Sequence, residues 1–282
     1  MKTVLIPNNN EQSREAAERI VSRLHDCGCR VVMPTRLSRK YSGLAEFLPD
    51  DECFRDASLC IVIGGDGAVL HSAKSAALHG VPVLAVHTGR VGFLTTPEEA
   101  IPPELSDAAA SMRTEKRSML DVKVLDANGR ECFSDTALNE AVISRGEISR
   151  IIELALSVDG CLVNNIRGDG AIISTPTGST AYSMSAGGPI VSPEVAAILV
   201  TPICPYTLAA RSVVFPDSAE VSAEVFGLGD RVAMLTVDGD SSFSLQDGMR
   251  VVVRRSEKSL ELLVSDEASF NEKMKTKLFG IK

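Results

Sequence analysis

Tryptophan is absent from the 282 residues, and aromatic residues make up only 4% of them. Proteins that hold single-stranded nucleic acid by base stacking need aromatic platforms, so the composition argues against that function. The net charge is −8 and the isoelectric point is about 5.2. Because no dense basic cluster offsets this acidity, we do not expect nucleic acid as a partner.

Long apolar runs and metal-ligand spacings are also lacking. No segment reaches the roughly 18 apolar residues of a membrane-spanning helix, and the apolar part of Met1–Pro7 is too short for a signal peptide. The seven cysteines form no Cys-x-x-Cys pair, and none of the four histidines is spaced with a second to hold zinc. We therefore expect reduced thiols, a cytoplasmic protein and no membrane partner.

The stretch 59–70 carries the strongest local signal. The apolar run Cys60–Ile63 predicts a buried strand, and three glycines follow within four residues. Apolar residues at helical spacing come next, at Leu70, Ala73, Ala77 and Leu78. A strand, a glycine turn and a helix together present backbone N–H groups to a phosphate. The sequence therefore predicts a phosphate-binding turn.

Asp66 lies inside this turn, between Gly65 and Gly67. A carboxylate there repels a phosphate unless a metal or a hydroxyl group lies between them. We therefore interpret Asp66 as the chemical centre and the glycines as its setting. The alternative is that Asp66 is only the N-cap of the following helix.

Residues 1–117 alternate between strand and helix, which predicts an α/β domain with a parallel sheet and ligands at the carboxyl ends of its strands. The expected strands are Thr3–Pro7, Arg30–Met33, Cys60–Ile63 and Val81–His87, and the helices include Glu11–Leu24 and Glu98–Met112. A second glycine-bearing loop, Thr88–Leu94, follows the last of these strands.

Residues 118–264 change to an alternating period with hairpin turns at Asn128-Gly129 and Asp159-Gly160. Expected strands include Ile151–Val158, Val213–Phe215, Glu220–Phe226, Val232–Val237, Arg250–Arg255 and Leu260–Val264. This pattern predicts an all-β domain, most simply a sandwich. Residues 265–282 are mixed and polar, and we expect a helix or a tail there.

Two stretches of the β half do not read as packing alone. Asn139-Glu140 is a polar pair between apolar residues, for which an exposed strand pair is the alternative. Six hydroxyl side chains lie between Ser174 and Tyr182, more than a turn needs. The surplus could bind a sugar or a base edge, and the alternative is a capping turn rich in serine and threonine.

The sequence does not match several known nucleotide-binding, metal-binding and catalytic motifs. Leu70 occupies the third glycine position of the Gly-x-Gly-x-x-Gly dinucleotide fingerprint, and Phe243 stands where a calcium loop needs glycine. No Walker A sequence and no Gly-x-Ser-x-Gly nucleophile motif occurs.

The motifs that remain resemble, in order and spacing, those of the NAD kinase family. They are Gly64-Gly65-Asp66-Gly67, Gly92-Phe93-Leu94, Asn139-Glu140, Gly168-Asp169-Gly170, Thr175 through Tyr182, and Gly187-Gly188-Pro189. The resemblance implies an N-terminal Rossmann-like α/β domain, a C-terminal β-sandwich and an active site in the cleft between them. It implies transfer of the ATP γ-phosphate to the 2′-hydroxyl of the adenosine ribose of NAD, giving NADP and ADP.

The same resemblance assigns roles to individual residues. Asp66 would be the catalytic base or orienting carboxylate, and Asn139 and Glu140 would hold a ribose diol. Arg167 would favour NAD over NADH, and Asp169 would contact the other nucleoside end, from a neighbouring subunit in one arrangement. The remaining nucleotide-binding candidates are Gly65, Gly67, His71, Phe93, Thr180, Ala181, Tyr182, Ser185 and Asp238.

The four acids Asp66, Glu140, Asp169 and Asp238 would repel one another in one site unless a metal or hydrogen bonds offset their charge. We therefore expect Mg²⁺ as the cofactor, with ATP and NAD as substrates, and a homodimer or homotetramer. Two alternatives stay open: a lipid or sugar kinase sharing only Gly64–Gly67, and a non-catalytic NAD(P) sensor.

Overall fold

The computed structural model describes residues 1–89, 91–102, 104–105, 108–146, 150–207, 209–265 and 269–280. The chain divides into two units, Met1–Arg117 with Leu260–Lys282 and Ser118–Ser259. The two units are joined along the chain by strands β7 (Arg113–Leu125) and β18 (Arg250–Val264). The C-terminal segment thus belongs to the N-terminal unit, where the sequence suggested a separate piece.

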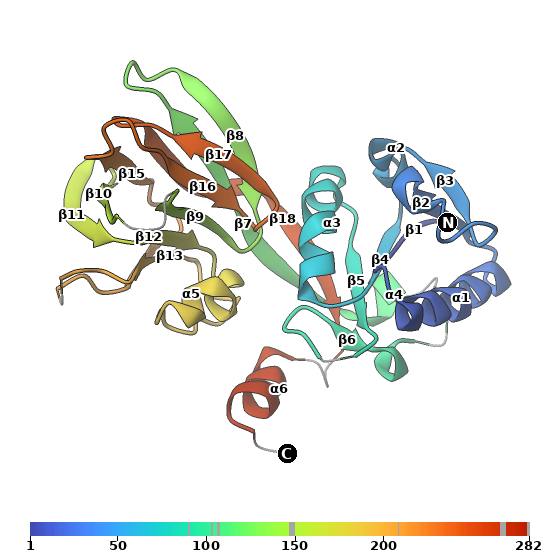
Figure 1. The fold of residues 1–282 in the computed structure, drawn as a ribbon. Coiled ribbons are helices and arrows are strands. Elements are labelled where there is room, and N and C mark those ends of the chain that lie inside the picture. Colours follow the sequence, from blue (N-terminus) through green and yellow to red (C-terminus); the bar gives the residue numbers. More distant parts are fainter. Residues whose placement is uncertain are drawn as a thin grey trace. The chain divides into compact units, whose positions relative to one another are not determined.

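A parallel sheet forms the middle of the N-terminal unit (Figure 1). Its strands are β1 (Lys2–Pro7), β2 (Arg30–Pro34), β3 (Glu46–Leu48), β4 (Leu59–Ile63), β5 (Val83–His87) and β6 (Thr96–Pro97). The order is β3-β2-β1-β4-β5, with the end of β18 added beside β5, and every one of these pairs is parallel. Both glycine loops therefore leave the carboxyl ends of adjacent strands.

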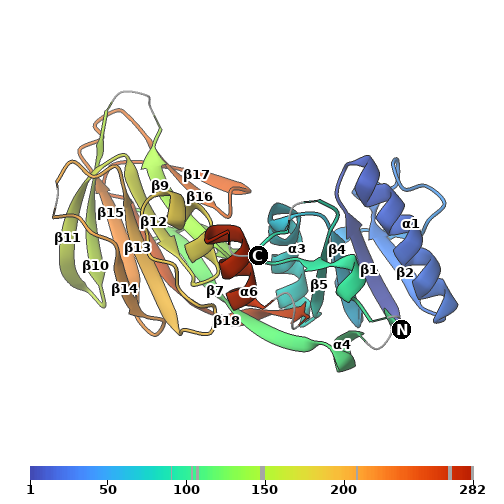
Figure 2. The same cartoon turned by 90° about the horizontal axis from the view of Figure 1, so that it is seen from below.

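The helices of this unit are α1 (Glu11–Asp26), α2 (Asp50–Phe54), α3 (Asp66–His79), α4 (Ala108–Ser111) and α6 (Phe270–Lys273). Single turns of 3₁₀ helix occur at Thr35–Leu37 and Glu98–Ala100, and a π-helical turn at Met274–Leu278. Asn10 caps α1 by accepting a hydrogen bond from the Ser13 amide at 2.7 Å. Helices α1 and α3 lie on opposite sides of β4 (Figures 1 and 2), which buries the whole strand.

The structure corrects one expectation for this unit and refines another. The predicted helix Glu98–Met112 is a 3₁₀ turn and the short α4, because Pro102 has no amide hydrogen to donate to a helix. Part of that prediction falls on residues 103, 106 and 107, which lie outside the described residues. Of the apolar residues at helical spacing in α3, Ala73 and Ala77 are buried, together with Val69 and Ala76, whereas Leu78 is 62% exposed.

Antiparallel strands build the C-terminal unit. They are β8 (Glu131–Ala137), β9 (Glu140–Arg145), β10 (Ile152–Val158), β11 (Cys161–Gly168), β12 (Gly170–Ser174), β13 (Ala197–Ile203), β14 (Val213–Pro216), β15 (Val221–Phe226), β16 (Ala233–Val237) and β17 (Ser241–Leu245). The only helical segments described in this unit are a 3₁₀ turn, Gly178–Thr180, and α5 (Tyr182–Ser185).

One sheet of this unit has the order β14-β13-β12-β9-β16-β17, and β10, β11, β15 and β18 pair in another. Alternate residues of both sheets share one apolar core, which includes Ile143, Leu154, Ala171 and Val253. The predicted α/β plus β-sandwich fold is therefore confirmed. The strands expected at Arg250–Arg255 and Leu260–Val264 are one continuous strand, β18.

The predicted hairpin turns form as expected. Asp159 and Gly160 both have positive φ, 50° and 78°, in the turn between β10 and β11. Gly129 has a φ of 80° between β7 and β8. These backbone conformations favour glycine, asparagine and aspartate, which explains the residue types.

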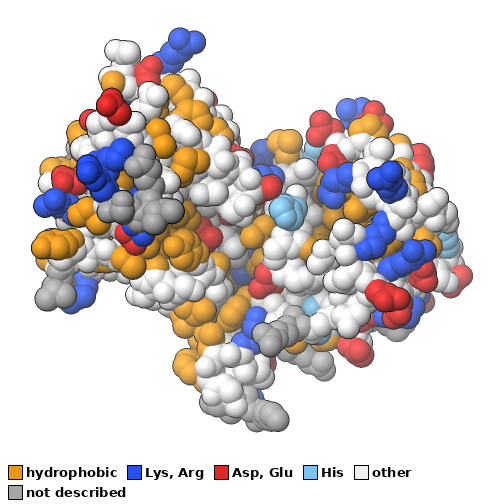
Figure 3. Space-filling view, in the orientation of Figure 1, with side chains coloured by type: hydrophobic (Ala, Val, Ile, Leu, Met, Phe, Trp, Pro, Cys, Tyr) orange, Lys and Arg blue, Asp and Glu red, His pale blue; other side chains and the backbone are white. Residues whose placement is uncertain are grey.

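The surface of the N-terminal unit mixes charges of both signs on the face in Figure 3. Ion pairs of this unit include Arg19–Glu98 and Arg30–Glu46, both with 2.8 Å separations. All seven cysteines are free. No helix within the described ranges has the length and apolar character needed to cross a membrane.

Candidate active site

Asp66 is the first residue of α3, and its N-cap is Gly65. The Asp66 carboxylate accepts two backbone hydrogen bonds from the second glycine loop, Phe93 N to Oδ2 at 2.8 Å and Leu94 N to Oδ1 at 2.9 Å. The N-cap alternative is therefore wrong, because the side chain turns to a neighbouring loop rather than to its own helix. Two loops far apart in sequence meet at this one carboxylate.

Gly92 makes that meeting possible. A Cβ atom added at Gly92 would lie 1.8 Å from Asp66 Oδ1, far inside van der Waals contact. The Gly92 amide donates to Thr95 Oγ1 at 2.8 Å, which tightens the same loop. Glycine is thus required at position 92 by the approach of the acid, and any other residue would displace it.

Gly65 and Gly67 show the opposite situation. A Cβ atom added at either position would meet no protein atom within 4 Å. Both residues are exposed, and neither has a positive φ. No internal packing explains glycine at these two positions, so the space in front of their backbone is open to a ligand.

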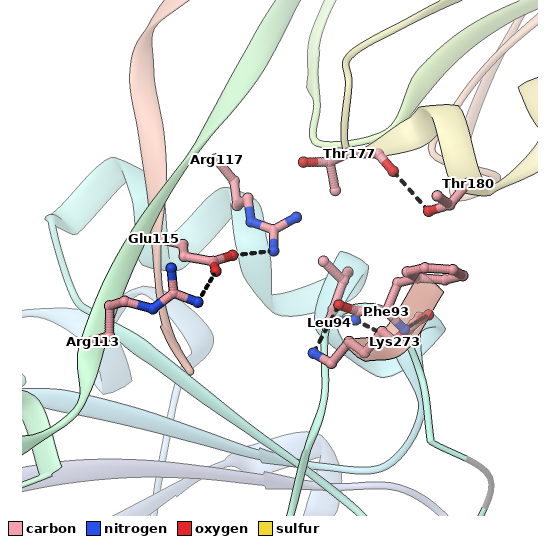
Figure 4. A network of polar contacts seen from close by, with 9 residues as sticks. Phe93, Leu94, Arg113, Glu115, Arg117, Thr177, Thr180 and Lys273 are labelled. Carbon is pink, nitrogen blue, oxygen red and sulfur yellow. Dashed lines mark hydrogen bonds and ion pairs between the residues drawn. The ribbon is translucent and has the colours of Figure 1, made fainter. Parts of the chain in front are cut away.

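Buried cations surround Asp66 within the same unit. Arg117 is 2% exposed and donates to Glu115, which also accepts from Arg113 at 2.7 Å (Figure 4). Lys273 is 3% exposed, and its Nζ donates to the backbone oxygen of Phe93 at 3.0 Å. Burial lowers the pKa of both cations, that of Lys273 to about 8, while the negative charge of Asp66 acts in the opposite direction.

In the C-terminal unit, Asp238 organises the predicted Asn139-Glu140 pair. The buried Asp238 carboxylate accepts from three consecutive amides, Leu138 N at 2.7 Å, Asn139 N at 2.8 Å and Glu140 N at 3.0 Å. Asp238 has a positive φ of 51° in the turn between β16 and β17. Its carboxylate therefore holds the backbone that presents Asn139 and Glu140.

Glu140 is 8% exposed, and its Oε2 atom has no hydrogen-bond partner among the described residues. Burial, and secondarily the charge of Asp238, raises the pKa of Glu140 to about 8. Both influences favour the protonated form of the Glu140 carboxyl group. A buried carboxyl with an unpartnered oxygen next to Asn139 is suited to hydrogen-bond a hydroxyl-bearing ligand.

The hydroxyl-rich turn is more structural than expected. Thr175 Oγ1 donates to Leu138 O at 2.6 Å, Ser179 Oγ to Pro176 O at 2.6 Å, and Thr180 Oγ1 to Thr177 O at 3.2 Å. Three of the six hydroxyl groups thus satisfy backbone acceptors, as the capping-turn alternative predicts. Gly178 packs so closely on Asn139 that a Cβ atom added at Gly178 would lie 2.3 Å from the backbone oxygen of Asn139.

Asp169 and Arg167 lie away from this pair. Strands β12 and β9 pair antiparallel, with Ser174 opposite Glu140 at one end and Gly170 opposite Ser144 at the other. Asp169 comes directly before Gly170, so it lies at the end of the strand pair away from Glu140. Asp169 pairs with Arg145 at 3.1 Å, and Arg167 pairs with Glu153 at 3.0 Å. The structure thus separates the predicted residues of the C-terminal unit into two groups.

The other candidates lie near these groups. Phe93 is half-buried, its ring is 6.1 Å from that of Phe270, and Lys277 Nζ lies 4.5 Å from its centre. His71 is exposed on α3. Thr180 ends the 3₁₀ turn, half-buried Ala181 follows it, and α5 carries the exposed side chains of Tyr182 and Ser185.

Each of the four candidate acids has its own compensation. Backbone amides hold Asp66 and Asp238, Arg145 pairs with Asp169, and burial raises the pKa of Glu140. Hydrogen bonds and an ion pair therefore offset part of the negative charge of these acids within each unit. Within the described part of the chain, no group of three histidine, cysteine, aspartate or glutamate side chains could hold a metal ion.

Sequence reasoning did not find the contacts of Gly92, Arg117 and Lys273 with the surroundings of Asp66. The glycine in the second loop was a signal for the first of these. Arg117 and Lys273 carry no local signal, because their roles arise from contacts with residues distant in sequence.

Comparison with known proteins gives a consistent result. Residues 4–111 match the ATP-NAD kinase N-terminal domain, and residues 138–265 match the ATP-NAD kinase C-terminal domain. A protein of Aromatoleum aromaticum named NAD kinase is 38% identical over 275 residues, covering 95% of this chain and 90% of that protein.

Two solved structures have a similar fold. A yeast NADH kinase complexed with NADH superimposes with a TM-score of 0.87, covering 99% of this chain and 87% of the other. An NAD kinase from Archaeoglobus fulgidus in complex with ATP gives a TM-score of 0.75, covering 99% and 98%. Both are 24% identical to this chain, so they establish likeness of fold and nothing finer.

Proposed function

This chain belongs to the NAD kinase family, as its motifs predicted, and we propose that it transfers the γ-phosphate of ATP to the 2′-hydroxyl of the adenosine ribose of NAD. The products are NADP and ADP. The observation that carries this proposal is the Asp66 carboxylate, held at the start of α3 beside two glycines that face open space.

Asp66 acts on the proton of the accepting hydroxyl. A carboxylate has about four lone-pair positions, and the Phe93 and Leu94 amides occupy two of them. Each oxygen can therefore accept a further hydrogen bond from the ribose 2′-hydroxyl. Phosphoryl transfer needs chiefly this positioning together with charge stabilisation at the phosphates. The backbone of Gly65 and Gly67 faces the pyrophosphate, and His71 contributes to the same region.

The C-terminal unit binds the nucleosides. Asn139 and the protonated Glu140 hydrogen-bond a ribose diol, whose hydroxyl groups both donate and accept. Asp238 fixes the backbone that presents them. Thr180, Ala181, Tyr182 and Ser185 contact the adenine. In the N-terminal unit, Phe93 is a further nucleotide-binding residue.

Asp169 and Arg167 bind a different part of the dinucleotide, since β12 separates them from Glu140. Arg167 favours NAD over NADH, and it also contacts phosphate bidentately, exchanging its pair with Glu153 for the ligand. The chain assembles as a homodimer or homotetramer in which Asp169 serves a neighbouring subunit. Seven free thiols suit a reducing compartment, and we place the enzyme in the cytoplasm.

Mg²⁺ enters as part of the nucleotide substrate. The described residues offer no cluster of ligands for a resident metal, and Mg²⁺ commonly binds through substrate phosphates with few protein ligands. When bound, it neutralises phosphate charge. We expect turnover to require Mg²⁺ while folding does not, and thermal unfolding with and without EDTA checks the second part.

The test is a coupled assay of purified protein with ATP, NAD and Mg²⁺, in which NADP is detected by an NADP-specific dehydrogenase. We expect NADP only in the complete mixture, and a panel of other triphosphates, polyphosphate and NADH defines donor and acceptor range. Folded protein that binds NAD without forming NADP would instead support a non-catalytic sensor. Phosphorylation of diacylglycerol would support a lipid kinase.

A further inference from the structure

Lys273 is a buried cation that the proposed reaction does not use. It ends α6, whose N-cap Ser269 accepts a hydrogen bond from Glu272 N at 3.4 Å. Its side chain is almost fully enclosed, and its described hydrogen bond goes to the backbone oxygen of Phe93 (Figure 4). Burying an ammonium group costs free energy, so its presence needs a reason.

The acceptor of Lys273 belongs to the peptide group that holds Asp66. The Phe93 carbonyl and the Leu94 amide are the two ends of one planar peptide group. Lys273 Nζ donates to the Phe93 oxygen at 3.0 Å, and the Leu94 N–H donates to Asp66 Oδ1 at 2.9 Å. Hydrogen bonds in such a chain polarise one another, so the ammonium strengthens the bond to Asp66 and fixes the plane of the peptide.

The charged groups around Lys273 come from three elements. Arg117 and Glu115 face it from β7, Asp66 from α3, and Lys277 from the turn that follows α6. The two cations disfavour the charged form and the two carboxylates favour it. Burial is the largest influence, and together these leave Lys273 with a pKa of about 8, so that it is charged at neutral pH and loses its charge just above.

We propose that Lys273 is a positioning residue for Asp66, acting through the Phe93–Leu94 peptide group. This inference rests on the proposed function, in which Asp66 orients or accepts the proton of the ribose hydroxyl. It makes the C-terminal helix α6 a part of the active site, although α6 lies more than 200 residues after Asp66 in the chain. Without the ammonium group, the Phe93–Leu94 peptide can rotate, and the Asp66 carboxylate is no longer held in the orientation that the ribose hydroxyl requires.

A purely structural role is the competing explanation. Lys273 could serve only to tie the C-terminal segment to the unit. However, the ring contact between Phe93 and Phe270 and the position of Lys277 over the Phe93 ring tie the same segment down. Removal of the Lys273 charge leaves both contacts in place, so the two explanations predict different results.

The test compares Lys273→Met and Lys273→Arg with Lys275→Met, a control on the next turn whose lysine is exposed and pairs with Glu272. We expect Lys273→Met to lower kcat about 10- to 100-fold, the usual scale for a misplaced catalytic group, with KM for ATP and NAD changed less than about threefold. Its melting temperature stays equal or rises, because a buried charge is removed. Lys273→Arg restores part of kcat, and Lys275→Met behaves as wild type.

A pH series gives an independent readout on the wild-type protein. As Lys273 loses its proton above about pH 8, wild-type kcat falls, whereas Lys273→Arg keeps its kcat to higher pH because arginine stays charged. Wild-type kcat in Lys273→Met, or a loss of melting temperature in proportion to kcat, overturns the inference. The same alkaline fall in wild type and Lys273→Arg also overturns it. If the wild type itself forms no NADP, the proposed function fails first and the inference fails with it.

Discussion

The two units place their candidate carboxyl groups in opposite environments. In the N-terminal unit, Asp66 receives two backbone amides and lies near the cations Arg117 and Lys273. In the C-terminal unit, Glu140 has a buried oxygen without a partner and lies beside another carboxylate, Asp238. Amide donors and cations thus face the first carboxyl group, whereas burial and a neighbouring carboxylate raise the pKa of the second. Surroundings, rather than residue type, distinguish these two groups.

The largest expected effect comes from removing the charge in the first environment. Asp66→Asn keeps the shape but lacks the second acceptor oxygen and the basicity. We expect kcat to fall about 10²- to 10⁴-fold, the range for loss of a positioned general base, with a melting temperature close to wild type. Steady-state kinetics and calorimetry check this, and near-normal turnover would remove Asp66 from its role.

Gly92→Ala tests whether the acid needs the close approach of the second loop. The added Cβ would lie 1.8 Å from Asp66 Oδ1, so the carboxylate or the loop must move. We expect about 10²-fold lower kcat, and a loss of about 1–3 kcal/mol in unfolding free energy. Gly89→Ala in the same loop is the control, because its nearest neighbour, Gln12 Oε1, is 4.0 Å away. Equal behaviour of the two variants would contradict the account.

Asp238→Asn tests the second environment. The amide offers one acceptor oxygen where the carboxylate serves three amides, so buried N–H groups lose partners. We expect a loss of about 1–3 kcal/mol in urea unfolding and a higher KM for NAD. The exposed Asp230→Asn provides a comparison. Unchanged stability and KM in Asp238→Asn would show that the backbone of Leu138–Glu140 keeps its conformation without the Asp238 carboxylate.

The pH dependence of stability tests Glu140 itself. The pKa of Glu140 is raised in the folded protein to about 8, so the folded state holds a proton that the unfolded state releases near pH 4.5. Wild-type unfolding free energy should therefore fall between about pH 5 and pH 8 relative to Glu140→Gln. Urea unfolding across this range measures the difference, with the exposed Glu257→Gln as control. Parallel curves for wild type and Glu140→Gln would show that Glu140 is ionised throughout.

Local patterns predicted the fold well, for reasons visible in single elements. Strand β4, the glycine turn and α3 form where apolar runs and glycines indicated them, and the hairpin turns carry residues that tolerate positive φ. The strand β18 was expected in two pieces because of the polar residues between Arg254 and Ser259. It is continuous, with Arg254, Arg255, Glu257 and Lys258 exposed and only Ser256 buried among them.

The site was predictable in its motifs and not in its connections. Asp66, Asn139 and Glu140 stood out because polar residues interrupt apolar runs. Lys273 could not be predicted, because its proposed role depends on a hydrogen bond to Phe93, which lies 180 residues earlier in the chain. The hydroxyl-rich turn was overinterpreted for the converse reason, because Thr175 and Ser179 bond to backbone acceptors that local sequence does not reveal.

The most direct test of the central claim is a crystal structure of the protein with NAD bound. The account predicts an Asp66 carboxylate oxygen within about 2.6–3.2 Å of the 2′-oxygen of the adenosine ribose. An Asp66 side chain turned away from that oxygen, with another residue at hydrogen-bond distance in its place, would contradict it.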